Sequence, residues 1–359
     1  MSGRAIVALS GGVDSAVAAL RLRRAGRDVH GLFMHNWEED EQGYCTAAED
    51  FQDARRVAAE LGIPLHAVDL SREYRERVFA RFLEEYRAGR TPNPDITCNR
   101  EIKFGDCLMH ARRLGGSELA TGHYARLESG PDGPELHLAA DADKDQTYFL
   151  HEVPRARFAE AAFPLSDLNK DEVRELAREA GLPVHDKRDS TGICFIGERP
   201  FREFLARHVE TTPGPIESSD GQMVGEHIGL PFYTPGQRSG IGIGGRADGS
   251  GGAWYVVAKR PESNTLVVAQ EANHPLLITS VLSTRPVNWL CEPPAAPFEA
   301  EVRLRHRQAL QPARVTPLSD GGVRIETRDP QRAIAAGQSA VIYRDSRCLG
   351  GGVIDRTAI

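Results

Sequence analysis

Three stretches of different pattern predict an α/β protein with a doubly wound, mainly parallel sheet, a small β-rich central domain and a C-terminal antiparallel β-barrel. Over residues 1–205, short apolar strands alternate with amphipathic helices, which is typical of a parallel sheet covered on both faces. Residues 206–274 are dense in glycine and carry only short strand patterns. Over residues 275–359, alternating strands recur between turn residues, which favours a small closed barrel.

The first domain is expected to begin with a strand over residues 6–9 and a helix from Val13 to Gly26. Further strand patterns lie at 28–35, 64–70 and 117–128, and helical patterns lie at 46–61, 71–89, 100–115 and 169–181. Residues 127–140 resemble a hairpin insertion. Ligands of such sheets bind outside the carboxyl ends of the strands, so the loop after the first strand is the expected site.

The strands expected in the two later domains follow the same alternation of apolar and polar residues. In the central domain they lie at 221–230, 254–261 and 265–270, and in the barrel at 277–284, 298–306, 313–319, 322–328, 339–345 and 348–354. In RLRHRQ this alternation would place Arg303, Arg305 and Arg307 on one solvated face, a position that is also open to RNA.

The composition indicates a protein of two or three domains without a membrane span. The 359 residues are 26% charged and 40% hydrophobic, with no run of 18 apolar residues. The first strand begins too early for a signal or transit peptide, so we expect a cytoplasmic protein and, by default, a monomer. No C-x-x-C pair occurs among the six cysteines, which disfavours a zinc site or a disulfide framework.

The charge is unevenly distributed along the chain. The whole chain carries −7, but residues 273–359 contain eleven Arg, no Lys and eight Asp or Glu, a local charge of +3. A basic surface attracts polyanions, so this region is the better candidate for contact with nucleic acid. Chance variation within a small domain would explain the same difference.

The segment Ser10-Gly11-Gly12-Val13-Asp14-Ser15 is the clearest functional signal. Two glycines allow a tight turn whose N–H groups face an anion, and the following helix directs its positive end there. No Gly-Lys-Ser/Thr closes the loop and the G-x-G-x-x-G spacing is missing, so it is neither a P-loop nor a dinucleotide fingerprint. A plain strand-to-helix turn is the alternative. The loop resembles the PP-loop of ATP pyrophosphatases.

Two cysteines stand in polar settings. Cys98 follows a proline-rich loop that contains Asp95, and Asn99 is a candidate cap for the next helix, which would favour the thiolate. Cys194 follows the polar turn DSTG. For either residue, a buried packing role is the alternative. Cys107 and Cys348 fit packing, and Cys45 could be a loop thiol.

Eight segments, in order, resemble the bacterial tRNA-specific 2-thiouridylases. They are SGGVDS, MHNWEED, TPNPDITCN-EIKF, TGHYAR, DKDQTYFL, STGICFIGER-FREFL, YTPGQR-G-GIGG and WYVV-K, and together they span nearly the whole chain. The resemblance implies that ATP adenylates the C2 oxygen of the wobble uridine (position 34) of tRNA and releases pyrophosphate. A cysteine persulfide then delivers sulfur to C2 and AMP leaves, giving 2-thiouridine.

The resemblance also implies roles for individual residues. Cys194 would carry the persulfide, Cys98 would form a transient disulfide with it, and Asp95 would be a general acid or base. The residues that match ATP-contacting positions are Ala8, Leu9, Ser10, Gly11, Gly12, Val13, Asp14, Ser15, Met34 and Gly122. Those that match tRNA-contacting positions are Asn93, Pro94, Asp95, His123, Lys144, Asp145, Gln146, Arg305, His306 and Gln338. Without the family, Met34 would be read as core filler.

The implied partners are the tRNAs for Lys, Glu and Gln, and a cysteine desulfurase or sulfur-relay protein. Mg²⁺ is expected with the ATP phosphates, although the sequence contains no dedicated metal cage. Two positions depart from the family pattern: Ala16 stands where many relatives have serine, and His35 where Lys or Arg is frequent. The alternatives are another PP-loop ATP pyrophosphatase, acting on tRNA or on a small molecule, and a non-catalytic RNA-binding or sulfur-carrier protein.

Overall fold

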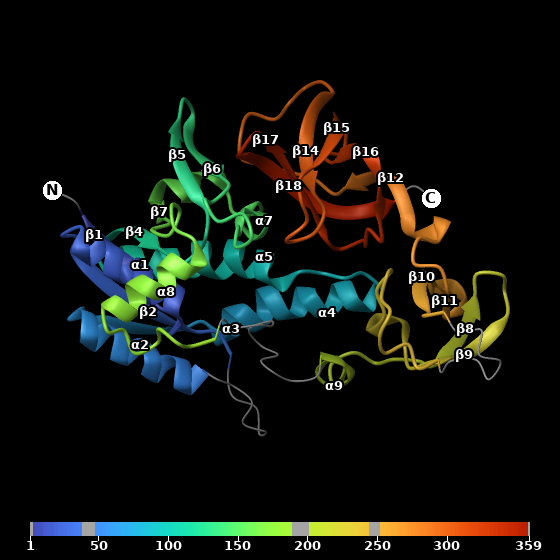
Figure 1. Cartoon of the computed structure of the whole chain (residues 1–359), viewed down its shortest axis with the longest axis horizontal. Coiled ribbons are helices and arrows are strands. Elements are labelled where there is room, and N and C mark those ends of the chain that lie inside the picture. Colours follow the sequence, from blue (N-terminus) through green and yellow to red (C-terminus); the bar gives the residue numbers. More distant parts are fainter. Residues whose placement is uncertain (1–2, 38–46, 189–200, 244–251, 358–359) are drawn as a thin grey trace.

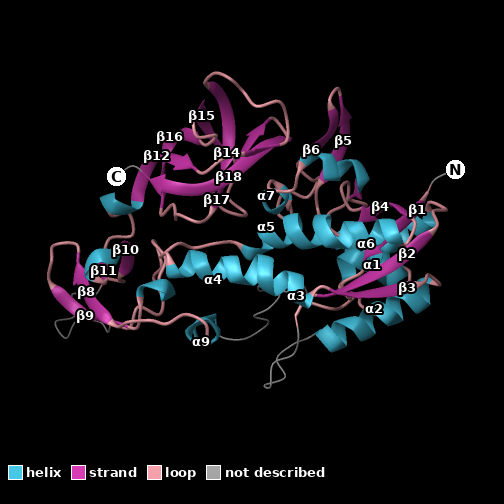
Figure 2. Ribbon diagram, turned by 180° about the vertical axis from the view of Figure 1, so that it is seen from behind, coloured by secondary structure: helices cyan, strands magenta, loops and turns pink. Residues whose placement is uncertain are grey.

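The computed structural model describes residues 3–37, 47–188, 201–243 and 252–357. The N-terminal half of the chain forms a parallel sheet flanked by helices. The barrel and a small second sheet lie further along the long axis of the molecule (Figure 1). A helical run extends from the first sheet and passes beneath the barrel (Figure 2). None of the described helices is long and apolar enough to cross a membrane.

The first sheet has five parallel strands and confirms the predicted α/β class. In spatial order they are β3 (Leu65–Asp69), β2 (Val29–His35), β1 (Arg4–Ala8), β4 (Gly116–Ala120) and β7 (Ala161–Ala162). Along the first strand, Ile6 and Ala8 pack on one face, while Val7 and Leu9 pack on the other. Because both faces are covered, the sheet is doubly wound as expected.

The helices divide between these two faces. One face packs against α1 (Val13–Arg24), α2 (Ala47–Leu61) and α8 (Lys170–Glu179). The helical run that starts on the other face comprises α3 (Ser71–Tyr74), the π-helical η1 (Arg75–Phe79), α4 (Ala80–Arg87), α5 (Pro94–Cys98), the π-helical η2 (Asn99–Cys107) and α6 (Leu108–Arg113). Within this run, α4 extends away from the sheet beneath the barrel (Figure 2).

The start of the second helical run differs from the prediction. The run begins at Pro94, and Asn93 is its N-cap, accepting a hydrogen bond from the Asp95 N–H at 3.1 Å. Asn99 does not cap a helix, because it lies inside the helical run, with φ of −60° and ψ of −44°, and its Nδ2 donates to the Phe149 carbonyl at 3.0 Å. Proline at the first helical position after a capping asparagine is a strong start signal, and it moves the start several residues upstream.

The pattern at 117–128 divides into two strands, with a loop over residues 121–125 between them. The expected hairpin is formed by β5 (Arg126–Gly130) and β6 (Gly133–His137), and it reaches the barrel through the pairing of His137 with Arg347. The chain then forms α7 (Thr147–Leu150) and η3 (Arg155–Glu160) before the last strand of the first sheet.

The small second sheet follows α9 (Phe201–Ala206). Its strands, in spatial order, are β10 (Tyr255–Arg260), β11 (Thr265–Ala269), β8 (Gly214–Ser218) and β9 (Met223–His227). Short 3-10 turns are η4 (Leu230–Phe232), η5 (Pro261–Ser263) and η6 (Pro275–Leu277). The strand β8 was not expected, because its sequence GPIES is short and has proline at its second position.

The barrel has six antiparallel strands, which close where the first and last of them pair. In spatial order they are β12 (Ile278–Thr284), β16 (Val323–Arg332), β15 (Gln311–Pro317), β14 (Phe298–Arg303), β17 (Ser339–Arg344) and β18 (Arg347–Thr357), and the short β13 (Asn288–Trp289) pairs with β18. The closed barrel confirms the sequence prediction.

The expected arginine stripe at the end of β14 is wrong. Arg303 is buried and forms a 2.7 Å ion pair with buried Asp145 of the first domain. The strand ends there, so Arg305 and Arg307 lie in the following turn, and Arg307 has φ of 65°. The strand alternation stops at the turn, and therefore the three side chains do not share a face.

Candidate active site

The glycine loop lies between the carboxyl end of β1 and the start of α1. Gly11 has φ of 77°, and a Cβ built on it would lie 2.3 Å from the Asp50 carbonyl oxygen, so only glycine fits there. The Ser10 N–H donates to Ser15 Oγ at 3.1 Å, and Ser15 Oγ donates to the Gly12 carbonyl at 3.0 Å. Gly12 is the N-cap and has no side chain with which to cap α1. The first N–H groups of the helix can therefore face an anion.

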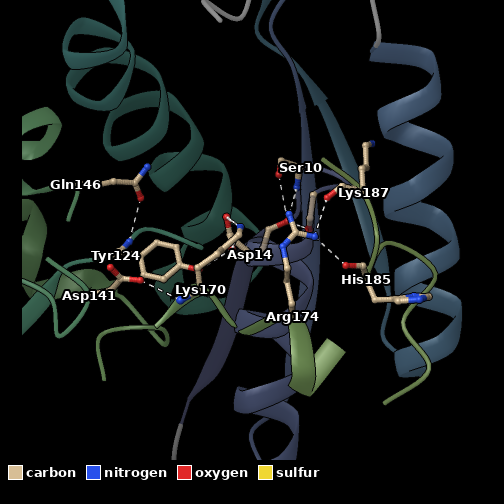
Figure 3. A network of polar contacts seen from close by, with 11 residues as sticks. Ser10, Asp14, Tyr124, Asp141, Gln146, Lys170, Arg174, His185 and Lys187 are labelled. Atoms are coloured by element: carbon tan, nitrogen blue, oxygen red, sulfur yellow. Dashed lines mark hydrogen bonds and ion pairs between the residues drawn. The ribbon is translucent and has the colours of Figure 1, made fainter. Parts of the chain in front are cut away.

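A polar network surrounds this loop (Figure 3). Lys170, the first residue of α8, places its Nζ 2.7 and 2.9 Å from the two carboxylate oxygens of Asp14. The Tyr124 hydroxyl donates to the same carboxylate at 2.8 Å. The Lys170 N–H donates to Asp141 at 3.0 Å, which fixes the start of the helix. The charge of Asp14 is thus neutralised within the protein.

Lys187 joins the loop to α2. Its Nζ donates to the Gly11 carbonyl at 3.2 Å, to Asp50 at 2.6 Å and to Asp53 at 2.5 Å. Burial by itself lowers the pKa of Lys187, but the bonds to the two aspartates outweigh it and raise that pKa. The ammonium stays charged and holds the loop against the helix.

Neither Lys170 nor Lys187 was expected at this loop. They lie far along the chain from the loop, in segments with no motif of their own. A signal was present, however: only five of the 44 basic residues are lysines, and two of the five hold this loop.

The other residues matched to ATP positions lie around the loop. Ala8 is the last residue of the buried strand β1, buried Leu9 follows it, and Val13 is buried at the start of α1. A Cβ on Gly122 would lie 2.7 Å from the Asp14 carbonyl carbon and the Ser15 nitrogen, so the loop over residues 121–125 packs closely against the glycine loop.

Three further positions are Met34 and the two departures from the family pattern, Ala16 and His35. Met34 is half-buried near the end of β2 and packs against the core, which fits both core packing and adenine contact. Ala16 is fully buried in the core cluster on the α1 face of the sheet. His35, the last residue of β2, is half-buried.

Asp95 and Cys98 both lie on α5. Cys98 is only 1% exposed and belongs to the core, contrary to the expectation of a thiol in a polar loop. The prolines begin a helix there instead of extending a loop, and this helix turns the thiol inward. Desolvation raises the pKa of the Asp95 carboxyl, and the charge of Lys103 opposes part of that rise.

His123 connects the glycine loop to this helical run. It follows Gly122, and its Nε2 lies 3.4 Å from Lys103 Nζ on η2, while its Nδ1 lies 2.7 Å from Thr121 Oγ1. Burial, together with the Lys103 charge, lowers the pKa of His123, so the ring is neutral at pH 7. Contacts therefore connect the glycine loop to the helical run in which Asp95 and Cys98 precede Lys103.

Cys194 and Cys45 lie outside the described residues, and the pairing of Cys98 with Cys194 stays a prediction. Cys107 and Cys348 are fully buried, in keeping with a packing role, and burial raises the pKa of each to about 12.

Besides Asp95 and His123, which are described above, the residues matched to tRNA contacts fall into two groups. Asn93 and Pro94 lie beside the barrel, where Gln338 Nε2 donates to the Thr91 carbonyl at 2.7 Å. The second group lies around α7 and the turn after β14, and consists of Lys144, Asp145, Gln146, Arg305 and His306.

The second group differs in exposure. Asp145 is buried in its ion pair with Arg303, and the Gln146 side-chain oxygen accepts the Tyr124 N–H at 3.0 Å. Arg305 is exposed, and the His306 ring is centred 4.4 Å from that of Phe149. Arg305 and His306 are thus better placed than Asp145 to meet RNA directly. The tRNA contacts remain predictions.

Because the family resemblance implies that the glycine loop binds the phosphates of ATP, we expect Lys170→Met to raise the KM for ATP about tenfold. Asp14 would lose its ion pair and carry a net negative charge near those phosphates, worth about 1.4 kcal/mol. Steady-state pyrophosphate release measures this. Lys170→Arg should retain most of the affinity, and Lys170→Met combined with Asp14→Asn should recover part of it. An unchanged KM in the single variant would contradict this role of Lys170.

Relatives of nearly equal length show the family. A "tRNA-specific 2-thiouridylase MnmA" from Cupriavidus metallidurans is 51% identical over 358 residues, covering 99% of this chain and 100% of that protein. A protein of the same name from Dichelobacter nodosus is 52% identical, covering 97% and 93%. The chain belongs to the tRNA-specific 2-thiouridylase family.

Domain models of known families cover most of this thiouridylase chain. Residues 3–198 match a "tRNA methyl transferase HUP domain", 202–270 a "tRNA methyl transferase PRC-barrel domain" and 279–354 an "Aminomethyltransferase beta-barrel domain".

Two solved structures are more remote. The U34-tRNA thiolase NcsA from Methanococcus maripaludis is 18% identical, with a TM-score of 0.36, covering 57% of this chain and 63% of that one. A 4-thiouridine synthetase–RNA complex with bound ATP is 20% identical, with a TM-score of 0.35, covering 58% and 50%.

Proposed function

We propose that this thiouridylase catalyses ATP-dependent 2-thiolation of the wobble uridine of tRNA, giving 2-thiouridine, AMP and pyrophosphate. The observation that carries the proposal is the run of contacts from the glycine loop, through Gly122 and His123, to the helical run with Asp95 and Cys98. It supports an activated nucleotide and a thiol acting at adjoining positions. Family membership supports tRNA as the substrate.

The first step activates the base. The C2 oxygen of uridine attacks the α-phosphorus of ATP, a new O–P bond forms, and the α–β bond breaks to release pyrophosphate. The glycine loop stabilises the developing negative charge with its N–H groups. Asp95 acts as the base that takes the N3 proton, for which a raised pKa is suited.

The second step delivers sulfur. The outer sulfur of a Cys194 persulfide bonds to C2, and Cys98 attacks the inner sulfur, so that the S–S bond of the persulfide breaks and a Cys98–Cys194 disulfide forms. AMP leaves with the former C2 oxygen. A thiol reductant and a cysteine desulfurase or relay protein restore the enzyme for the next turnover.

Mg²⁺ is proposed to arrive with ATP. Among the described residues, no group of three or more His, Cys, Asp or Glu side chains could hold a metal ion, and Asp14 is already bonded to Lys170 and Tyr124. The phosphates and water would be its main ligands, and the ion would neutralise phosphate charge.

We propose a separate role for each of the three domains. Residues 1–205 would bind ATP and catalyse, 206–274 would form the central domain, and 275–359 would contact tRNA. The substrates would be the tRNAs for Lys, Glu and Gln, and the enzyme would act as a cytoplasmic monomer.

Incubation of the purified protein with MgATP, tRNA transcript and a sulfur donor tests this. We expect 2-thiouridine at position 34 by mass spectrometry of the nucleosides, together with pyrophosphate release. Absence of pyrophosphate release, with and without tRNA, would overturn the enzymatic assignment. Full activity of Cys98→Ser would point to a different use of the loop.

We expect Asp95→Asn to lower thiouridine formation about 10²- to 10⁴-fold, the range for loss of a general base. In the wild type, activity should fall on the acid side with a midpoint above 3.8, the ordinary pKa of Asp, because the carboxyl must ionise to act. A pH profile of single-turnover thiolation measures both effects.

The same substitution should stabilise the fold at pH 7. The folded protein binds the Asp95 proton more tightly than the unfolded chain does, so stability falls as pH rises from the unfolded pKa through the folded one. Thermal unfolding should show Asp95→Asn with a higher Tm at pH 7 and no difference at pH 3. A lower Tm of Asp95→Asn than of the wild type at pH 7 would contradict the conclusion that desolvation of the Asp95 carboxylate costs stability.

A further inference from the structure

A pocket lies where α4, the loop before α5 and the barrel meet. Arg81 lines it from α4, Asn93 and Thr97 from the loop and α5, and Gly337 and Ser339 from the barrel. The residue between the last two is Gln338, so the pocket lies between two positions that the family resemblance assigns to tRNA. Arg81 itself matches none of the segments that carried the resemblance.

Backbone contacts fix the walls of this pocket. The Thr91 N–H donates to the Ala336 carbonyl at 2.9 Å, and Gln338 Nε2 donates back to the Thr91 carbonyl at 2.7 Å. Gly337 has φ of 93°, and a Cβ there would lie 2.8 Å from the Thr91 nitrogen. The loop of the first domain and the barrel are therefore held together, and the pocket between them is already formed.

The carboxylates of the pocket are paired. Glu85 accepts from Arg90 at 2.5 and 2.9 Å and from Arg285 at 3.0 and 3.4 Å, and Glu152 accepts from Arg100 at 2.6 Å. Burial by itself raises the pKa of Glu85, but the two arginines lower it to about 2. Both carboxylates are therefore compensated by arginines.

Arg81 differs from these arginines. It is half-buried, and it makes no hydrogen bond or ion pair with any residue in the described part of the chain. A guanidinium has five donors in a planar fork that suits the oxygens of a phosphate. With its carboxylates paired, the pocket keeps a positive charge whose donors are available to a ligand.

We propose that Arg81 binds a backbone phosphate of tRNA next to the target uridine. This inference rests on the proposed function and adds a contact that positions the anticodon. Most protein contacts to nucleic acid that fix register are made to phosphates, and they act regardless of sequence. Arg81 is thus a positioning residue: it would hold the strand while Asn93 and Pro94 approach the base.

The first test compares Arg81→Gln with Arg72→Gln, which removes the same charge from α3, where the side chain is 79% exposed. Binding of a tRNA-Lys transcript is measured at several salt concentrations. We expect Arg81→Gln to weaken binding about tenfold and to reduce the slope of log Kd against log salt by about one. The KM for ATP should not change, and Arg81→Lys should restore part of the affinity. Wild-type binding and slope in Arg81→Gln would overturn the proposal.

The second test locates the phosphate. Anticodon stem-loops carrying one neutral methylphosphonate, at each linkage flanking position 34 in turn, are bound to the wild type and to Arg81→Gln. At one linkage the methylphosphonate should weaken binding to the wild type but cause no further loss of binding to Arg81→Gln. If the losses of binding caused by the methylphosphonate and by Arg81→Gln add at every linkage, the proposed contact is overturned. Slower sulfur loading of Arg81→Gln with unchanged tRNA binding would also overturn it, and would point to a protein partner instead. Absence of thiolation by the wild type would count against the proposed function, whereas these binding results test Arg81 separately.

Discussion

Replacing Cys194 by alanine should abolish 2-thiouridine formation while tRNA-dependent release of pyrophosphate continues. Adenylation needs the glycine loop and the uridine oxygen, whereas only the second step needs a persulfide, so the substitution should stop the reaction between the two. Mass spectrometry of the tRNA nucleosides and a pyrophosphate assay on the same sample separate the steps. The first turnover should show pyrophosphate without thiouridine.

Two companion variants define this result. Cys291→Ser removes a half-buried thiol in the barrel and should leave both products unchanged. Cys98→Ser should retain pyrophosphate release and lose 2-thiouridine from the first turnover onward, because no partner thiol then cleaves the S–S bond of the persulfide. Normal thiouridine in Cys194→Ala would refute the persulfide assignment. Loss of pyrophosphate release in the same variant would show that the residue serves adenylation as well.

The glycine loop and the positions of most strands along the chain were predictable because their signals are local. Alternating apolar residues identify the strands, and the segment Ser10–Ser15 carries its own turn chemistry. The helix that begins at Pro94 also carries a local start signal in Asn93-Pro94, but the proline-rich composition of the same segment favours a loop. Cys98 was therefore expected in a polar loop, although it is buried in a helix.

The support of the loop could not be predicted, because it depends on pairs that are distant in sequence. Lys170 is 156 residues from Asp14, and Lys187 is 176 residues from Gly11. No periodicity links such positions, and only the packing of α8 beside α1 brings the first pair together. Arg303 shows the same limit: its buried partner Asp145 lies in another domain, and strand alternation carries no information about it.

Gly11→Ala should lower kcat/KM for ATP roughly 100-fold, the equivalent of about 3 kcal/mol. The new methyl group would meet the Asp50 carbonyl oxygen, 2.3 Å from the ideal Cβ position, and the backbone also has φ of 77°. The backbone carbonyl of Asp50 cannot rotate away as a side chain can, so either the loop or α2 must shift. The N–H groups of the loop would then no longer point at the phosphates. Steady-state pyrophosphate release at varied ATP concentrations measures the loss.

Gly26→Ala is the matched control for that substitution. Gly26 has nearly the same backbone, with φ of 73°, but nothing lies within 4 Å of its ideal Cβ. It should cost about 1–2 kcal/mol of stability from the left-handed conformation alone and leave ATP kinetics unchanged. If the two variants lose a similar amount in Tm but differ in kcat/KM, the difference measures the effect of the steric contact with the Asp50 carbonyl, separate from the effect of backbone strain. Equal values of kcat/KM for ATP in the two variants would mean that phosphate binding does not depend on the close packing of this loop against α2.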